Sequence, residues 1–164
     1  MTIAVYAGTF DPITEGHRSV VQQAARLFTH VRVLVADNPD KQSTFSVAER
    51  LEMLDEVLGP IPNVSTGHTR GLVVNYARSV CANVLVRGIR GASDAAYEAD
   101  MAGENRRLAP ELATVLLAAE PELSDVSSSR LKELVLQGED VSRYCTPEVA
   151  QRVRARLLPD AIDV

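Results

Sequence analysis

Residues 8–17 have the composition of a phosphate-binding loop. Glycines stand at both ends of the segment, at positions 8 and 16, and His17 follows the second glycine directly. An apolar run of strand type, residues 3–7, precedes the loop, and apolar residues recur at helical spacing from Val20 onwards. A helix N-terminus offers free backbone N–H groups and the positive end of the helix dipole, and both attract anions. The segment therefore predicts a nucleotide phosphate site between a strand and a helix.

The spacing of these glycines argues against two common classes of nucleotide-binding protein. It matches neither the GxGxxG pattern of dinucleotide-binding enzymes nor the GxxxxGK[ST] pattern of P-loop proteins. Residues 14–17 instead resemble the TxGH form of the HxGH signature of the nucleotidyltransferase superfamily.

A second candidate phosphate site lies at residues 127–129, which are three consecutive serines. A strand-like run at 114–118 and a loop precede them, and an amphipathic helical pattern that stops near Gly138 follows. Serines at a helix start usually serve only as N-caps. Three in a row after a strand and a loop also offer hydroxyl and N–H groups to the outer phosphates of a triphosphate. The segment resembles the ISSSxxR/K signature of the same superfamily.

Residues 84–91 place two arginines directly after a strand. The run is apolar up to Val86 and continues with Arg87, Gly88 and Arg90. In an open parallel sheet, ligands gather at the carboxyl ends of the strands. Guanidinium groups match the geometry of phosphate oxygens. We therefore interpret both arginines as anion ligands.

The elements that must position these residues alternate between strand and helix. This order predicts a single-domain, Rossmann-like, doubly wound parallel α/β sheet with helices on both faces, over residues 1–164. A capping box at Ser46 and a proline at position 147 mark two helix starts. Strands are expected at 3–7, 30–37, 63–67, 83–87 and 113–118, and helices from 17, from 46 to 58, at 72–82, at 93–108, from 127 and from 146.

Composition and charge narrow the class of function. The net charge of −5 and the lack of basic runs longer than a pair argue against a nucleic-acid binder. The sequence has no apolar stretch of membrane-spanning length and no signal-peptide pattern, so we expect a cytoplasmic protein without membrane contact. Cys81 and Cys145 form no CxxC pair and are expected to be structural thiols. Arg152, Arg154 and Arg156 are expected to be a solvated helix end.

Six motifs in order resemble the bacterial phosphopantetheine adenylyltransferase family over nearly the whole chain. They are residues 8–17, 38–41, 71–76, 87–91, 94–107 and 126–129. The resemblance implies transfer of AMP from ATP to 4′-phosphopantetheine, giving dephospho-coenzyme A and pyrophosphate by in-line displacement without a covalent intermediate. The attacking oxygen belongs to an ionised phosphate, so no general base is required, and the enzyme must orient two anions and stabilise the charge of the transition state.

The resemblance also implies roles for individual residues. His17 is expected to be catalytic, as a donor to the α-phosphate. The acceptor would contact Thr9, Lys41, Val73 and Arg87. The ATP contacts would be Thr9, Phe10, His17, Gly88, Ile89, Arg90, Glu98, Leu123, Ser124, Asp125, Val126, Ser127, Ser128 and Ser129. Mg²⁺ would arrive with ATP, held by phosphate oxygens and water rather than by a protein site. Coenzyme A is an expected feedback ligand, and a homohexamer is the expected assembly.

Some positions depart from the family pattern. Leu123 stands where the family usually has an aromatic residue, and Asp125 where it usually has an aromatic residue or a histidine. Ala95 and Ala96 replace Phe-Glu, and Asp100 replaces a common glutamine. Asp125 either faces the triphosphate site and repels ATP, or faces solvent or a neighbouring subunit. Glu98 either contacts the nucleotide or only supports the dipole of its helix.

Three alternatives to the main interpretation remain open. The first is another nucleotidyltransferase of the same fold, such as a nicotinate mononucleotide adenylyltransferase. The second is a non-catalytic nucleotide sensor, which the presence of His17 with all three serines disfavours. The third is a pure interaction module.

Overall fold

The computed structural model describes residues 1–159, and a parallel sheet lies at the centre of the fold. Within these residues the sheet has five strands in the order β3-β2-β1-β4-β5. The expected doubly wound α/β architecture is confirmed. The strands are β1 (Ile3–Gly8), β2 (His30–Ala36), β3 (Val64–Thr69), β4 (Val84–Ile89) and β5 (Ala113–Ala118).

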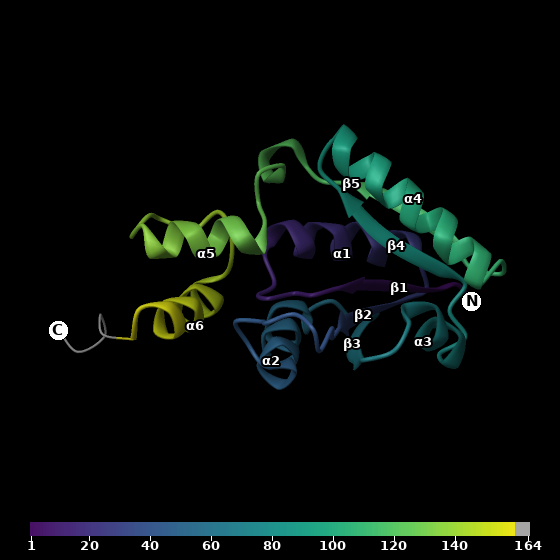
Figure 1. The fold of residues 1–164 in the computed structure, drawn as a ribbon, viewed down its shortest axis with the longest axis horizontal. Coiled ribbons are helices and arrows are strands. Elements are labelled where there is room, and N and C mark those ends of the chain that lie inside the picture. Colours follow the sequence, from purple (N-terminus) through teal and green to yellow (C-terminus); the bar gives the residue numbers. More distant parts are fainter. Residues whose placement is uncertain (160–164) are drawn as a thin grey trace.

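Helices cover both faces of the sheet (Figure 1). Helices α5 and α6 pack against each other at the end of the molecule opposite to the N-terminus (Figure 1). A short 3₁₀ turn, Pro121–Leu123, precedes α5. The helices are α1 (Glu15–Leu27), α2 (Val47–Leu58), α3 (Val73–Ser79), α4 (Ala92–Leu108), α5 (Ser128–Leu136) and α6 (Pro147–Leu157).

Strand β1 shows why the sheet is buried on both faces. Ala4 and Tyr6 point into a large core shared with α1, α2, α5 and α6. Val5 and Ala7 point into a smaller core shared with α3. Successive side chains of a strand alternate between faces, so a continuous apolar run fits a strand covered on both sides.

Several element boundaries differ from the sequence expectation, and the ends of α3 and β4 show why. Helix α3 ends at Ser79 rather than at 82, because Cys81 adopts a left-handed conformation (φ 54°) and the Ala82 N–H turns back to the Ala77 carbonyl at 2.8 Å. Strand β4 continues to Ile89, because its last residues still pair with β5. Both end points depend on contacts that local composition does not encode.

Helix α6 is held to α2 by ion pairs, so the expectation of a solvated helix end is wrong for two of its arginines. Arg152 binds Glu52 at 3.1 Å and Glu56 at 2.5 Å. Arg156 binds Glu49 and donates to the Thr44 carbonyl. Each guanidinium thus bridges helices that lie far apart in the sequence.

The two cysteines differ in their surroundings. Cys81 and Cys145 are both free, with Cys81 exposed and Cys145 buried. Burial raises the pKa of the Cys145 thiol to about 11.

Residues 1–159 contain no helix with both the length and the apolar character needed to cross a membrane.

Candidate nucleotide-binding site

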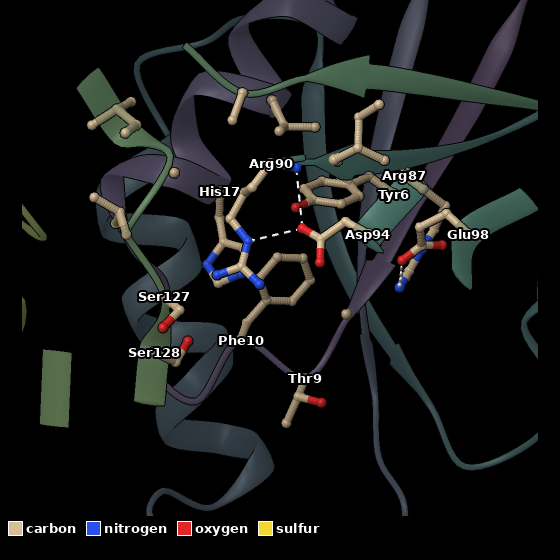
Figure 2. Close-up of a pocket in the computed structure, with 18 of the residues that line it drawn as sticks. Tyr6, Thr9, Phe10, His17, Arg87, Arg90, Asp94, Glu98, Ser127 and Ser128 are labelled. Carbon is tan, nitrogen blue, oxygen red and sulfur yellow. Dashed lines mark hydrogen bonds and ion pairs between the residues drawn. The ribbon is translucent and has the colours of Figure 1, made fainter. Parts of the chain in front are cut away.

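A cavity of about 400 Å³ lies where β1 and β4 end and where α1 and α5 begin. Figure 2 shows His17, Phe10 and Arg90 close together, with Ser127 and Ser128 on one side and the Arg87–Glu98 pair on the other. The structure thus brings together most residues that the sequence singled out. The predicted residues that line it are Thr9, Phe10, His17, Arg87, Gly88, Ile89, Arg90, Glu98, Leu123, Val126, Ser127 and Ser128.

Helix α1 begins with a capping arrangement that fixes the His17 ring. The Thr14 hydroxyl accepts from the His17 backbone N–H at 3.4 Å. The Thr14 backbone N–H donates to Nδ1 of His17 at 3.0 Å. Because Nδ1 accepts this hydrogen bond, it carries no proton in the neutral ring, and the proton lies on Nε2.

The environment of His17 keeps its ring neutral. Burial, together with the smaller effect of the positive charges of Arg90 and Arg87, lowers the pKa of His17 to about 4. At neutral pH the ring therefore supplies a hydrogen-bond donor without a positive charge.

Phe10, in the loop between β1 and α1, packs against the His17 ring. Its backbone lies in the left-handed region (φ 49°), and its side chain is 2% exposed. Its ring meets the His17 ring edge-on, with centroids 4.9 Å apart, and meets the Tyr6 ring edge-on at 5.4 Å. A left-handed phenylalanine costs about 1 kcal/mol or more, so burial of the ring must offset this strain. The strained loop in turn fixes His17.

Arg87 is held by a buried carboxylate. Its Nε and Nη2 donate to the two oxygens of Glu98 at 2.7 and 2.9 Å, and Nη1 donates to the Ala7 carbonyl at 2.5 Å. Glu98 is 7% exposed. The Glu98 carboxylate therefore orients Arg87, a role that neither alternative from the sequence had anticipated.

Arg90 is held by Asp94, a cavity residue that sequence reasoning missed. The carboxylate of Asp94 accepts from the Arg90 backbone N–H at 3.1 Å and from its Nε at 3.0 Å (Figure 2). Asp94 stands four residues after Arg90, a spacing that permits such a pair at a helix start and is the signal that could have found it. Tyr6 also lines the cavity, but its position in a buried strand gave no signal.

Two glycines permit the close packing around the cavity. A Cβ at Gly88 would lie 2.8 Å from Cγ2 of Val20, so α1 could not approach β4 as it does. A Cβ at Gly16 would lie 3.3 Å from the Val126 carbonyl oxygen, so the start of α1 also lies close to the loop before α5. The glycines bring both helix N-termini to one cavity.

The serines at α5 have different hydrogen-bond roles. The Ser127 hydroxyl oxygen caps α5 by accepting from the Arg130 backbone N–H at 3.1 Å, which leaves its own proton available to a ligand. The Ser128 hydroxyl donates to the Pro12 carbonyl at 2.7 Å and links the two loops. At the start of α5, the groups available to an anion are therefore the Ser127 hydroxyl and backbone N–H groups.

Five predicted contact residues, Lys41, Val73, Ser124, Asp125 and Ser129, lie outside the lining of this cavity in the part of the chain that the structure describes. Lys41 is exposed on the turn after β2. The Asp125 carboxylate is bound by Arg143 and by the Tyr144 hydroxyl. The alternative in which Asp125 faces the cavity and repels ATP is therefore wrong.

A second cavity of about 210 Å³ lies between α3, α4 and the sheet. It shares Ala7, Arg87 and Glu98 with the first cavity. Among residues 1–159, no aromatic side chain lines it. Its lining includes the apolar residues Leu72, Val73, Val74, Leu85, Met101 and Leu108 and the polar residues Asn105 and Thr114.

Solved structures with the same fold include two adenylyltransferases. A Vibrio parahaemolyticus protein assigned as a nicotinate-nucleotide adenylyltransferase is 16% identical, with a TM-score of 0.70 over 93% of this chain and 99% of its own. The Plasmodium falciparum nicotinic acid mononucleotide adenylyltransferase, solved with NaAD, is 14% identical, with a TM-score of 0.71 over 97% of each chain. The same Plasmodium falciparum enzyme solved with APC gives a TM-score of 0.70 at 14% identity.

At this level of identity, these similarities establish the fold. A match of residues 5–134 to the Cytidylyltransferase-like family covers most of the sequence. It includes the TxGH loop, both arginines and the three serines. The chain therefore belongs to the cytidylyltransferase-like family of nucleotidyltransferases.

Proposed function

We propose that the protein is an adenylyltransferase that transfers AMP from ATP to 4′-phosphopantetheine, releasing pyrophosphate. The observation that carries the proposal is the meeting of two unlike cavities at Arg87 and Glu98. One cavity offers helix N-termini, His17 and arginines, which suit a nucleotide triphosphate. The other offers an apolar recess beside the same arginine, which suits the organic part of a phosphate monoester.

The first cavity supports in-line transfer without a protein base. An ionised oxygen of the acceptor phosphate attacks the α-phosphorus of ATP, the bond from that phosphorus to the α,β-bridging oxygen breaks, and pyrophosphate leaves with the electron pair. Negative charge grows on the α-phosphate oxygens during this step. The Nε2–H of His17 is the donor that stabilises it, while Arg90 and the start of α5 hold the departing phosphates.

The second cavity supports phosphopantetheine as the acceptor. Arg87 would hold the acceptor phosphate, and the arm would extend past Val73 into the recess. A pantetheine arm combines methyl and methylene groups with amides, which matches apolar walls that carry Asn105 and Thr114. Lys41 lines neither cavity in the described residues, and its role as a second phosphate ligand rests on the family resemblance alone.

Nicotinate mononucleotide is the main alternative acceptor, and the similar solved structures favour it. Its planar pyridine ring would be recognised best by stacking on an aromatic side chain. The second cavity offers none within residues 1–159. This lack of a stacking partner favours a flexible arm over a planar ring.

Magnesium would enter with ATP on phosphate oxygens. The carboxylates in the cavity, Asp94 and Glu98, are each bound to an arginine, and residues 1–159 contain no group of three candidate metal ligands. These donors do not fit a protein-bound metal site, so no catalytic step is assigned to one.

Parallel assays with the two acceptors test the proposal. Purified protein receives ATP and Mg²⁺ with either 4′-phosphopantetheine or nicotinate mononucleotide, and pyrophosphate and the adenylylated product are measured. We expect turnover with phosphopantetheine and at least a hundredfold lower kcat/KM with nicotinate mononucleotide. Preference for nicotinate mononucleotide would establish the alternative acceptor. ATP binding without turnover of either acceptor would indicate a nucleotide sensor.

A further inference from the structure

Asp125, Arg143 and Tyr144 form a hydrogen-bonded cluster beside the nucleotide cavity. Nη1 and Nη2 of Arg143 donate to the two oxygens of Asp125 at 2.9 and 2.7 Å. The Tyr144 hydroxyl donates to Oδ2 of Asp125 at 2.7 Å. Nη1 of Arg143 also donates to the Glu122 carbonyl at 2.6 Å. One guanidinium therefore fixes both ends of the segment 122–125.

The same cluster is attached to the start of α1. The Tyr144 side chain is buried in the larger core, and its backbone carbonyl accepts from the Glu15 N–H at 2.8 Å. Glu15 is the first residue of α1, two residues before His17. The cluster thus connects the helix that carries the catalytic donor with the segment that leads into α5.

Only Val126 separates Asp125 from the serine that caps α5. Val126 is 4% exposed, and its carbonyl oxygen faces Gly16. A shift of Asp125 would therefore move the Val126–Ser127 backbone, which lines the cavity where the triphosphate is proposed to bind.

We infer that Asp125 and Arg143 are positioning residues, which set the distance between the N-termini of α1 and α5 and thereby the affinity for ATP. The inference rests on the proposed function, because it assigns the triphosphate to these two helix ends. Neither residue lines the cavity in the described part of the chain, so both act through the backbone at Val126 and Ser127 and through Tyr144. The acceptor cavity lies on the other side of Arg87 and is expected to be unaffected.

The hydrogen bonds of Asp125 to Arg143 and Tyr144 are not weakened by protonation near neutral pH. The hydrogen bonds from Arg143 and Tyr144 hold the pKa of the Asp125 carboxyl well below its usual range. The pair is about half exposed, with side chains 49% and 53% accessible, so added salt weakens it.

Two mild variants and a matched control test the inference. Asp125→Asn and Arg143→Ala each break the paired hydrogen bonds. Glu111→Gln breaks the Arg78–Glu111 pair, whose two residues line neither cavity and which has a similar distance (2.6 Å) and similar side-chain exposure (45% and 52%). Binding of ATP with Mg²⁺ is measured by calorimetry, KM for ATP and for the acceptor by initial rates, and Tm by calorimetric melting.

Both cluster variants are expected to bind ATP roughly three- to fivefold more weakly, the size of a half-exposed ion pair. Acceptor KM should stay within about twofold, and Tm should fall no further than in Glu111→Gln. The double variant should resemble either single variant, because both remove the same interaction. Tyr144→Phe, which keeps the buried ring, should weaken ATP binding less than Asp125→Asn.

Opposite results overturn the inference in distinguishable ways. If the parent binds ATP and the cluster variants bind it equally well, the positioning role is wrong and the proposed function stands. If both acceptor KM and Tm change together with ATP affinity, the cluster serves overall stability alone. If the parent binds no ATP, the proposed function fails and the inference fails with it.

Discussion

The two cavities that meet at Arg87 are built by different means. The nucleotide cavity is made from loops and helix ends, and its contacts come from a histidine, serines, glycines and backbone N–H groups. The acceptor cavity is made from ordinary apolar side chains of α3, α4 and the sheet. The first kind of site requires particular residues at fixed local spacing, while the second requires only volume and polarity at the right place. If the proposed function holds, the reaction type depends on short motifs, and the choice of acceptor depends on the packing of α3 and α4 on the sheet.

The largest effect is expected from His17→Ala, which removes the donor on the nucleotide side. Loss of one preorganised transition-state donor lowers turnover by about a hundredfold or more. The acceptor cavity does not include His17, so acceptor affinity should change little. Steady-state kinetics with both substrates measure the two effects separately. A variant within a few fold of the parent in kcat would remove His17 from the mechanism.

Arg87→Met, at the boundary between the two cavities, should lower both acceptor affinity and folding stability. Loss of the guanidinium weakens acceptor binding by roughly tenfold or more, since a charge-assisted contact to the phosphate disappears. Folding stability should also fall by about 2–3 kcal/mol, because Glu98 is left buried without its partner.

The double variant Arg87→Met with Glu98→Gln separates these two consequences. It removes the unpaired charge, so much of the stability measured by urea unfolding should return. Acceptor affinity measured by calorimetry should stay low. Recovery of acceptor affinity in the double variant would show that Arg87 serves structure alone.

Ala102→Phe tests the acceptor cavity from the side of α4. Ala102 lines this cavity and does not line the other. A phenyl ring in a recess of about 210 Å³ takes the space proposed for the arm, so acceptor KM should rise roughly tenfold while ATP affinity stays constant. Gly103→Ala is the matched control, because a Cβ there meets no atom within 4 Å. Equal effects of both variants, or a loss of ATP affinity, would contradict the division into two cavities.

The last prediction concerns stability rather than substrate binding, and it is a pH dependence that His17 confers. Its pKa of about 4 in the folded protein lies below the usual value of 6.5, so the unfolded chain takes up the proton first as the pH falls. The free energy of unfolding of the parent should therefore fall as the pH is lowered from 6.5 to 4, with a slope that corresponds to the uptake of at most one proton. Above pH 6.5, His17 should add no further pH dependence. His17→Gln should lack this contribution. Urea unfolding of both proteins from pH 4.5 to 8 measures the difference, and a difference independent of pH would show that His17 titrates normally.

The contrast between the cavities also explains how much the sequence could predict. Residues such as His17, Ser127 and Arg90 line one cavity, because each follows a strand or begins a helix and the sheet topology brings those points together. The parallel sheet and its burial on both faces followed from the alternation of elements and the apolar runs, while the order of the strands comes from the structure alone.

Ion pairs between residues far apart in the sequence could not be predicted from sequence patterns. Asp125 meets Arg143, which stands 18 residues later, and Arg152 meets Glu52, which stands 100 residues earlier. Such contacts depend on how helices and loops pack, and a charged residue has the same local signature whether it is solvated or paired. The role of Glu98 was missed for the same reason.

Helix α4 has little apolar attachment to the rest of the protein. Within residues 92–108, the structure buries only Glu98, whereas α1 buries Ser19, Val20, Val21 and Ala24. Its ion pairs to Arg87 and Arg90 hold it on the sheet, and Tyr97 and Met101 stay exposed. A helix attached in this way opens locally at low free energy, and its amide hydrogens should exchange with solvent earlier than those of α1. One wall of the second cavity would then open more readily than the sheet beneath it. Because added salt weakens ion pairs, it should speed amide hydrogen exchange in α4 before it speeds exchange in the strands.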